Sequence, residues 1–319
     1  MLILDGHAVD GLPAALPSTT AWIDIVDGSP EEIGWVERQT GLHVPTLAEL
    51  SEIESSSRLR VESGTFYLST PQVVRSGSAA PVTTALGFVL SKDRLITVRF
   101  APLTAFATFA KDWTTPGRCH PGSAGAFVGL LDAIVDRIAD VLEQVGSDLD
   151  AVSLRVFGDR LAGPPAHEDA DLRGFLRRIG RSGDLASKIR DSLLGIGRIV
   201  PYVLGQSADW LPMELRIRME TQRADIASLS DYDAHLTSKV QLLLDATLGL
   251  INIEQNNIIK VLTVVSVVGV PPTLVASLYG MNFHNMPELS WSWGYPYGLA
   301  LIAVSALAPL IWFKLRGWL

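Results

Sequence analysis

The chain of 319 residues has a single cysteine and few histidines, and these form no catalytic or metal-binding motif. Because Cys119 has no partner, no disulfide can form within the chain, and no Cys or His cluster surrounds it to bind zinc. The six histidines are scattered, and neither an H-E-x-x-H pattern nor a nucleophile with a paired base is present. We therefore expect a protein that is not an enzyme and that carries no organic cofactor.

Basic residues are also scarce. The 26 Lys and Arg are outnumbered by 34 Asp and Glu, the net charge is −8, and no basic patch stands out. Binding to nucleic acid needs clustered cations against the phosphates, so nucleic acid is not an expected partner. The chain lacks a G-x-x-x-x-G-K-[ST] loop for ATP, and its start, MLILDGHAVDG, lacks the basic region of a signal peptide.

Charge is missing from two apolar runs near the C-terminus, residues 258–280 and 295–313, apart from Lys260. From Val261 to Tyr279 the first run spans roughly 28 Å as a helix, about the thickness of the bilayer core. Buried core helices are the alternative, but these seldom go so long without a charge. Membrane helices tolerate the prolines in both runs where neighbouring groups satisfy the freed carbonyls. We therefore predict two transmembrane helices and a lipid bilayer around them.

Basic residues around the two runs predict their orientation. Lys260 enters the first span, Lys314 and Arg316 follow the second, and the connecting loop has neither Lys nor Arg. Both termini are thus expected on the cytoplasmic side of the cytoplasmic (inner) membrane, with the loop outside. Aromatic residues cluster where interfaces are expected: Trp291, Trp293, Tyr295 and Tyr297 outside, and Trp312 and Trp318 inside.

The stretch before the first span predicts one very long helix. No Pro or Gly occurs between Met213 and Gly249, and the pattern runs into the span, so a helix over 212–280 would be on the order of 100 Å long. Its heptad seam can face another copy of the stalk or the chain's own helices, and both can hold at once. The seam consists of Leu229, Leu236, Val240, Leu243, Thr247 and Leu250.

Two further helices are predicted over residues 124–159 and 168–204. The first carries acids at helical spacing, which are either a solvated face relieved by Arg137 or a surface that gathers cations. These acids are Asp132, Asp136, Asp140 and Glu143.

Residues 1–122 are typical of an α/β domain. The β-rich runs AWIDI, RLRVE, TFYLST, ALGFVL and RLITVRF are separated by turn residues. SPEEIGWVERQTG is a helix with Ser29 as N-cap, Pro30 in its first turn and Gly41 past its end. Residues 73–84 are predicted to be a flexible hairpin connection.

The predicted fold class is an α+β membrane protein with a cytoplasmic α/β domain, a long helical stalk and two C-terminal transmembrane helices. The predicted segments are the α/β domain (1–122), the helical stalk region (123–257), the first transmembrane helix (258–280), the outer loop (281–294), the second transmembrane helix (295–313) and a basic cytoplasmic tail (314–319).

The outer loop carries the most specific motif of the chain. YGMN at residues 279–282, with MPEL at 286–289 and a second span behind it, resembles the signature of the CorA family of divalent metal ion channels. The resemblance extends through NNIIKVLT to the tail KLRGWL and covers the whole chain. It implies a homopentameric funnel, with the first span lining the pore, that takes up Mg²⁺ and also Co²⁺ and Ni²⁺.

The resemblance also implies site residues. Gly280, Met281 and Asn282 would form the selectivity filter, where a ring of Asn282 amide oxygens accepts hydrogen bonds from the first-shell waters of Mg²⁺. Such recognition suits an ion that dehydrates reluctantly. Glu288 and His284 would lie at the mouth and capture ions. The pore-lining positions would be Asn256, Ile259, Leu262, Val270 and Thr273.

Two positions depart from the family pattern. His284 replaces a frequent acid of the mouth, and Thr221 stands where the stalk usually bears a regulatory carboxylate, which leaves Glu220 and Asp225 as candidates to bind regulatory Mg²⁺. A loop histidine favours softer metals. A zinc transporter of the same superfamily, proton-coupled or not, is therefore one alternative, and a non-conducting membrane-anchored sensor or scaffold is another.

Overall fold

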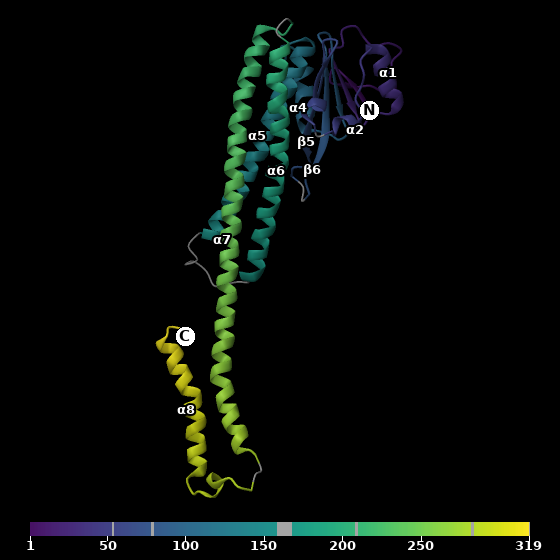
Figure 1. Ribbon diagram of the computed structural model, residues 1–319. Helices are drawn as coiled ribbons and strands as arrows, with labels where there is room; N and C mark the ends of the chain where they lie inside the picture. Colours follow the sequence, from purple (N-terminus) through teal and green to yellow (C-terminus); the bar gives the residue numbers. More distant parts are fainter. Residues whose placement is uncertain (53, 78–79, 158–167, 208–209, 282–283, 319) are drawn as a thin grey trace. The chain divides into compact units, whose positions relative to one another are not determined.

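The computed structural model describes the chain except residues 53, 78–79, 158–167, 208–209, 282–283 and 319 (Figure 1). The chain divides into two compact units, unit 1 from Met1 to Leu244 and unit 2 from Asp245 to Leu319. Unit 1 contains the sheet and the helices around it, and unit 2 contains the two apolar helical segments.

Unit 1 has a seven-stranded sheet in the order β2-β1-β3-β7-β6-β5-β4, in which β3 and β7 are parallel and the other neighbours antiparallel. The five runs predicted as strands are β3 to β7. Strands β1 and β2 were not predicted, because they are too short to show an alternating pattern. The strands are β1 (Leu2–Leu4), β2 (His7–Ala8), β3 (Trp22–Val26), β4 (Leu59–Glu62), β5 (Thr65–Val74), β6 (Val82–Leu90) and β7 (Leu95–Arg99).

The prediction of a flexible connection over residues 73–84 was wrong at both ends. β5 continues to Val74, β6 begins at Val82, and these two residues are paired across the hairpin. Val and Thr at the ends of the segment are β-branched and pack well on a pleated surface. Their preference for strand outweighs the Ser, Gly and Pro residues between them.

Helix α1 (Pro30–Thr40) begins and ends where its capping residues predict. The Ser29 hydroxyl accepts a hydrogen bond from the Glu32 amide at 3.2 Å, and the Glu32 carboxylate accepts one from the Ser29 amide at 2.8 Å. Gly41 ends the helix with φ 69°, a left-handed conformation that glycine adopts without strain. Two short helices follow, α2 (Leu47–Leu50) and α3 (Ser55–Arg58).

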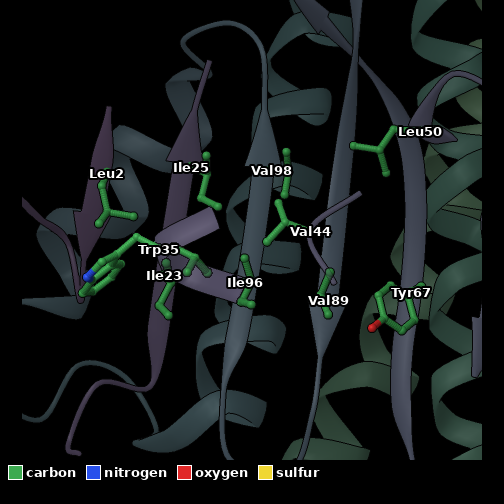
Figure 2. Close-up of a cluster of buried hydrophobic side chains, with 11 residues drawn as sticks. Leu2, Ile23, Ile25, Trp35, Val44, Leu50, Tyr67, Val89, Ile96 and Val98 are labelled. Carbon is green, nitrogen blue, oxygen red and sulfur yellow. The ribbon is translucent and has the colours of Figure 1, made fainter. Parts of the chain in front are cut away.

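Both faces of the sheet are covered by apolar side chains. On one face, α1 and α2 pack on alternate residues of the strands (Figure 2). On the other, Trp22 packs edge-to-face on Phe109 of α4 (Thr104–Trp113), with ring centroids 5.1 Å apart. The first cluster consists of Leu2, Ile23, Ile25, Trp35, Val36, Val44, Leu50, Tyr67, Val89, Ile96 and Val98.

A buried ion pair joins the two parallel strands. Asp24 is 1% exposed and Arg99 is 6% exposed, and the Arg99 guanidinium donates to Asp24 Oδ2 at 2.8 Å. The Thr97 hydroxyl donates to Asp24 Oδ1 at 2.8 Å and accepts from the Trp22 indole at 3.0 Å. Removing one partner of such a pair leaves an uncompensated charge in a medium of low dielectric.

Three long helices form a bundle in unit 1: α5 (Gly122–Phe157), α6 (Glu168–Gln206) and the first part of α7 (Met213–Tyr279). They correspond to the predicted helices, except that residues 158–159 lie outside the described residues. The Gln222 amide donates to the Val128 carbonyl of α5 at 2.9 Å, and Arg190 of α6 donates to Asp233 at 2.9 Å. A Cβ at Gly146 of α5 would lie 2.5 Å from the Tyr232 hydroxyl, so the absence of a side chain at Gly146 leaves room for the end of this tyrosine.

The heptad seam of α7 is buried within the chain in this unit. Leu236, Val240 and Leu243 are 1%, 7% and 0% exposed. Packing against the chain's own helices, one of the two partners expected for this seam, is therefore confirmed for unit 1. The seam alone gives no reason for a second copy there.

We predict that losing one partner of the Asp24–Arg99 ion pair destabilises the protein more than replacing both partners. Arg99→Ala should destabilise the protein by about 3–5 kcal/mol, because the Asp24 carboxylate is left buried without its partner. The double variant Asp24→Leu/Arg99→Met should recover most of this loss. Denaturant unfolding of the detergent-solubilised protein, followed by tryptophan fluorescence, measures both. A double variant no more stable than Arg99→Ala would contradict the explanation.

Candidate ion-conduction site

Unit 2 contains two helical segments with the length and composition of membrane spans. They are the C-terminal part of α7, which ends at Tyr279, and α8 (Gly294–Leu315). The second span was predicted within two residues of these bounds. Apolar side chains of both are exposed in the single chain, among them Leu262 at 66% and Val304 at 60%. Such surfaces require lipid or other protein around them.

Aromatic side chains pack together at both ends of α8. At its start, the rings of Trp291 and Tyr297 lie 5.8 Å apart. At its end, Phe313 lies between Trp312 at 5.1 Å and Trp318 at 5.4 Å. Clustered Trp and Tyr at the two ends of an apolar helix are typical of the two membrane–water interfaces.

One side of α7 carries a row of residues at alternating spacings of three and four. This spacing stays on one face because it is close to the helical repeat of about 3.6 residues. The members are Asn256, Ile259, Thr263, Ser266, Val270, Thr273, Ser277 and Gly280, which we call the 256–280 row. All are exposed except Thr263, which is half-buried.

The 256–280 row contains four of the five predicted pore-lining residues, and the fifth, Leu262, lies beside it. Sequence reasoning missed Thr263, Ser266 and Ser277, although their heptad spacing to Asn256 and Ile259 was a readable signal. Four residues on the opposite side of the helix are half-buried within unit 2. They are Val264, Val268, Pro271 and Val275.

Hydroxyl groups of the row are oriented by the helix backbone. The Thr263 hydroxyl donates to the Ile259 carbonyl at 2.8 Å, and the Thr273 hydroxyl donates to the Gly269 carbonyl at 2.9 Å. A hydroxyl oxygen that donates its proton in this way still has a lone pair that can accept from water. The row therefore offers neutral oxygen acceptors without a fixed charge.

Pro271 and Pro272 lie inside α7 without ending it, as predicted for a membrane helix. Each lacks an N–H, so the carbonyls four residues earlier, those of Val267 and Val268, lose their helical donor. This removes two backbone hydrogen bonds in the middle of the span. The freed carbonyls are additional oxygen acceptors in a segment that has no charged side chain.

At the outer end of the row, Gly280 and Met281 follow α7 directly, and their amides bond to the Ala276 and Leu278 carbonyls at 3.0 and 3.4 Å. Asn282, the central residue of the predicted filter, lies outside the described residues.

The predicted ion-capture residues lie further along the outer loop. His284 and Glu288 are both exposed, and Glu288 lies in the 3₁₀ helix η2 (Pro287–Ser290). Gly294 holds this turn against the start of α8, since a Cβ there would lie 2.2 Å from the Glu288 carbonyl oxygen. Sequence reasoning did not single out Gly294, because nothing local indicates which carbonyl it meets.

The predicted regulatory acids are not brought together. Glu220 pairs with Arg223 at 3.0 Å, whereas Asp225 lies near enough to Asp136 of α5 to influence it. Burial, followed by the carboxylates of Asp132, Asp140 and Asp225, raises the pKa of Asp136 above its usual value. Among the described residues, no group of three or more His, Cys, Asp or Glu is placed to hold a metal ion.

The acidic face of α5 is partly neutralised. Asp132 is hydrogen-bonded by Arg218 and Gln222 of α7, and Arg137 lies 3.8 Å from Asp140. The Asp136 carboxylate has neither a hydrogen bond nor an ion pair with any residue that the structure describes. The predicted relief by Arg137 therefore reaches Asp140, and the charge of Asp136 stays unpaired.

Comparison with known proteins places these features in one family. The model of the family described as "CorA-like Mg2+ transporter protein" matches residues 17–315. The magnesium transport protein CorA of Sodalis glossinidius is 32% identical, with 99% of this chain and 98% of that protein covered. That of Escherichia coli K12 is also 32% identical, with 93% and 92% covered.

Solved structures share the fold. The CorA magnesium transporter of Methanocaldococcus jannaschii has a TM-score of 0.76 at 21% identity, with 97% of this chain and 95% of that chain covered. This likeness confirms the predicted arrangement of an N-terminal α/β domain, a long helix and two C-terminal apolar helices. The family consists of ion transporters, which agrees with the expectation that the chain is not an enzyme. The chain belongs to the CorA-like Mg²⁺ transporter family.

Proposed function

We propose that five copies of this chain form a channel through which hydrated Mg²⁺ crosses the cytoplasmic membrane into the cell. The 256–280 row is the observation that supports this most. It gives the first span a continuous face of neutral oxygen acceptors and apolar residues, and it leads to the filter motif at Gly280. Five such faces around an axis would make a pore without fixed charge. Co²⁺ and Ni²⁺ would pass by the same route.

The absence of charge suits a magnesium ion. Mg²⁺ holds its first-shell waters tightly, and a ring of carboxylates would bind the ion too strongly for release. In our proposal, Asn282 amide oxygens accept hydrogen bonds from those waters, and Asn256, Thr273 and the other hydroxyls of the row do so deeper in the pore. Recognition then depends on the size and dipoles of the ring.

Apolar residues in and beside the row would form the gate. Ile259, Leu262 and Val270 are 60%, 66% and 62% exposed in the single chain, so they are available to meet their copies around an axis. Narrow apolar rings can close a pore to ions by excluding water. At the outer mouth, Glu288 and His284 would gather cations, with Glu288 supplying the negative charge.

The cytoplasmic acids give a second level of control. We propose that Mg²⁺ bound near Asp225 reduces the repulsion from neighbouring acids that, after burial, raises the pKa of Asp136. Glu220, the second candidate, pairs with Arg223 and would bind Mg²⁺ apart from this group. A cation that binds one state better than another shifts the population toward that state. The open channel would thus lose population as cytoplasmic Mg²⁺ rises. Both termini would lie in the cytoplasm, because the basic residues flank the spans on that side.

Asn282→Ala is expected to abolish selective Mg²⁺ uptake into liposomes while the oligomer stays assembled, because the filter loses its amide oxygens. The matched control is Asn285→Ala, which removes the same group from an exposed position three residues along the loop. Unchanged Mg²⁺ flux in Asn282→Ala would contradict the filter role. Zn²⁺ flux, with or without a pH gradient, in the absence of Mg²⁺ flux would contradict the choice of ion.

Val270→Thr should raise Mg²⁺ leak through the closed channel, because a hydroxyl ring of nearly the same shape holds water in the constriction. Val261→Thr is the control. The two valines are 62% and 64% exposed, and their separation of nine residues, about two and a half turns, puts them on opposite sides of the helix. Equal leak in both variants, measured as flux at high internal Mg²⁺, would show that the row does not face the pore.

Asp136→Asn should stabilise the protein at neutral pH by about 0.5 kcal/mol, a few tenths for each like-charge pair removed. The raised pKa means that the native state favours the protonated carboxyl. Stability is therefore lost as pH rises through the interval between the ordinary and the raised pKa, and the variant lacks this loss. Thermal unfolding from pH 4 to 8 tests this, and a wild type at least as stable as the variant at pH 7 would contradict it.

A further inference from the structure

A cavity of about 610 Å³ lies in unit 1 between α5, α6 and the turn that joins β5 to β6. Its size is within the range of small-molecule sites, which run from roughly 300 to 1,000 Å³. Three arginines from two helices line it, Arg137 of α5 and Arg178 and Arg181 of α6. This is a concentration of guanidinium groups in a chain whose acids outnumber its bases by 34 to 26.

The guanidinium groups are only loosely neutralised by the protein. Arg137 and Asp140 are 3.8 Å apart, and Arg178 and Asp148 are 4.0 Å apart, beyond hydrogen-bond distance in both cases. The Arg181 side chain makes no hydrogen bond or ion pair with any residue that the structure describes. Asp140 and Asp148 also line the cavity, so arginines outnumber carboxylates there by three to two. The guanidinium N–H groups that make no bond within the protein can therefore donate to an anion that enters the cavity.

One of the arginines is held in place. Arg137 donates to the Ser76 hydroxyl at 3.1 Å, which ties α5 to the β5–β6 turn at the edge of the cavity. A guanidinium fixed in this way loses less side-chain freedom when it binds. Planar guanidinium groups bind phosphate oxygens through two parallel hydrogen bonds, a geometry that a lysine cannot supply.

The remainder of the wall is partly apolar. Val141 and Val145 of α5 are 8% and 2% exposed, and Leu185 of α6 is half-buried, and all three line the cavity. An inorganic phosphate ion would leave most of such a volume empty. A ligand that joins phosphate groups to an apolar or aromatic part would use both kinds of wall.

We propose that this cavity binds a soluble organic phosphate of nucleotide size, with its phosphates on Arg137, Arg178 and Arg181 and its apolar part against Val141, Val145 and Leu185. The site is separate from the ion-conducting residues and does not depend on the proposed transport. It places a second ligand on α5 and α6, and α5 is also the helix that carries the acids near Asp225. Unit 1 would then bind a second kind of ligand in addition to a metal ion.

Calorimetric titration of the full-length protein in detergent with ATP, in magnesium-free buffer, tests the site. We expect saturable binding of ATP, and binding at least tenfold weaker in Arg181→Gln. Arg177→Gln is the matched control, because Arg177 is exposed on the same helix but does not line the cavity. ATP binding in this control should equal that of the wild type.

Tripolyphosphate, which has the phosphates without the apolar part, should bind at least tenfold more weakly than ATP. Arg178→Gln provides a second variant should Arg181→Gln fail to fold, and far-ultraviolet circular dichroism checks both. No saturable ATP binding at millimolar concentration, or equal weakening by Arg177→Gln and Arg181→Gln, would overturn the proposal. Tripolyphosphate binding as tight as that of ATP would overturn the organic ligand class.

Discussion

Backbone hydrogen bonding inside a bilayer is the constraint on which the rest of this protein depends. A segment without water around it must satisfy its N–H and C=O groups within itself, and a helix does so. α7 meets this condition across residues 258–279 and departs from it where Pro271 and Pro272 leave two carbonyls without helical donors. The same constraint removes charge from the span, so the recognition of ions that we propose there would depend on neutral oxygen atoms.

The same heptad spacing occurs in two parts of α7, one in unit 1 and one in unit 2. In unit 1, the seam of α7 that contains Leu236 and Leu243 is buried against the chain's own helices. In unit 2, the 256–280 row has equal spacing but stays exposed within the chain, and its members are mostly small or polar. The two parts differ in composition: large aliphatic residues fill a core, whereas hydroxyls and an amide suit the contact with water and ions that we propose for the row.

Charge in unit 1 is arranged in three different ways. Asp24 and Arg99 form a pair that is fully enclosed and hydrogen-bonded. Among the residues that the structure describes, the Asp136 carboxylate has no ion-pair partner and lies near other acids, where we propose that cations act. Within the same described part of the chain, the Arg181 side chain has no partner on the wall of a cavity, where we propose that an anion binds. The first arrangement contributes to the fold. In the other two, a charged group has no partner within the protein, so a ligand of opposite charge could lower the free energy by pairing with it.

The sequence by itself determined the features that depend on neighbouring residues. The absence of charge from 261 to 279 marks the first span, Ser29 and Gly41 set the ends of α1, and the YGMN and MPEL motifs indicate the family. Each is a local pattern that involves only residues close together in the sequence. The 256–280 row could also have been predicted in full from the sequence. Thr263, Ser266 and Ser277 continue the spacing of three and four residues that begins at Asn256.

Only the tertiary structure decided which distant residues meet. The pairing of Asp24 with Arg99 and the cavity of Arg137, Arg178 and Arg181 join residues that lie far apart in the sequence. The approach of Gly294 to the Glu288 carbonyl depends on how the loop folds back on itself. No local preference encodes such contacts. They follow from the packing of helices and strands, which fixes positions that the order of residues leaves open.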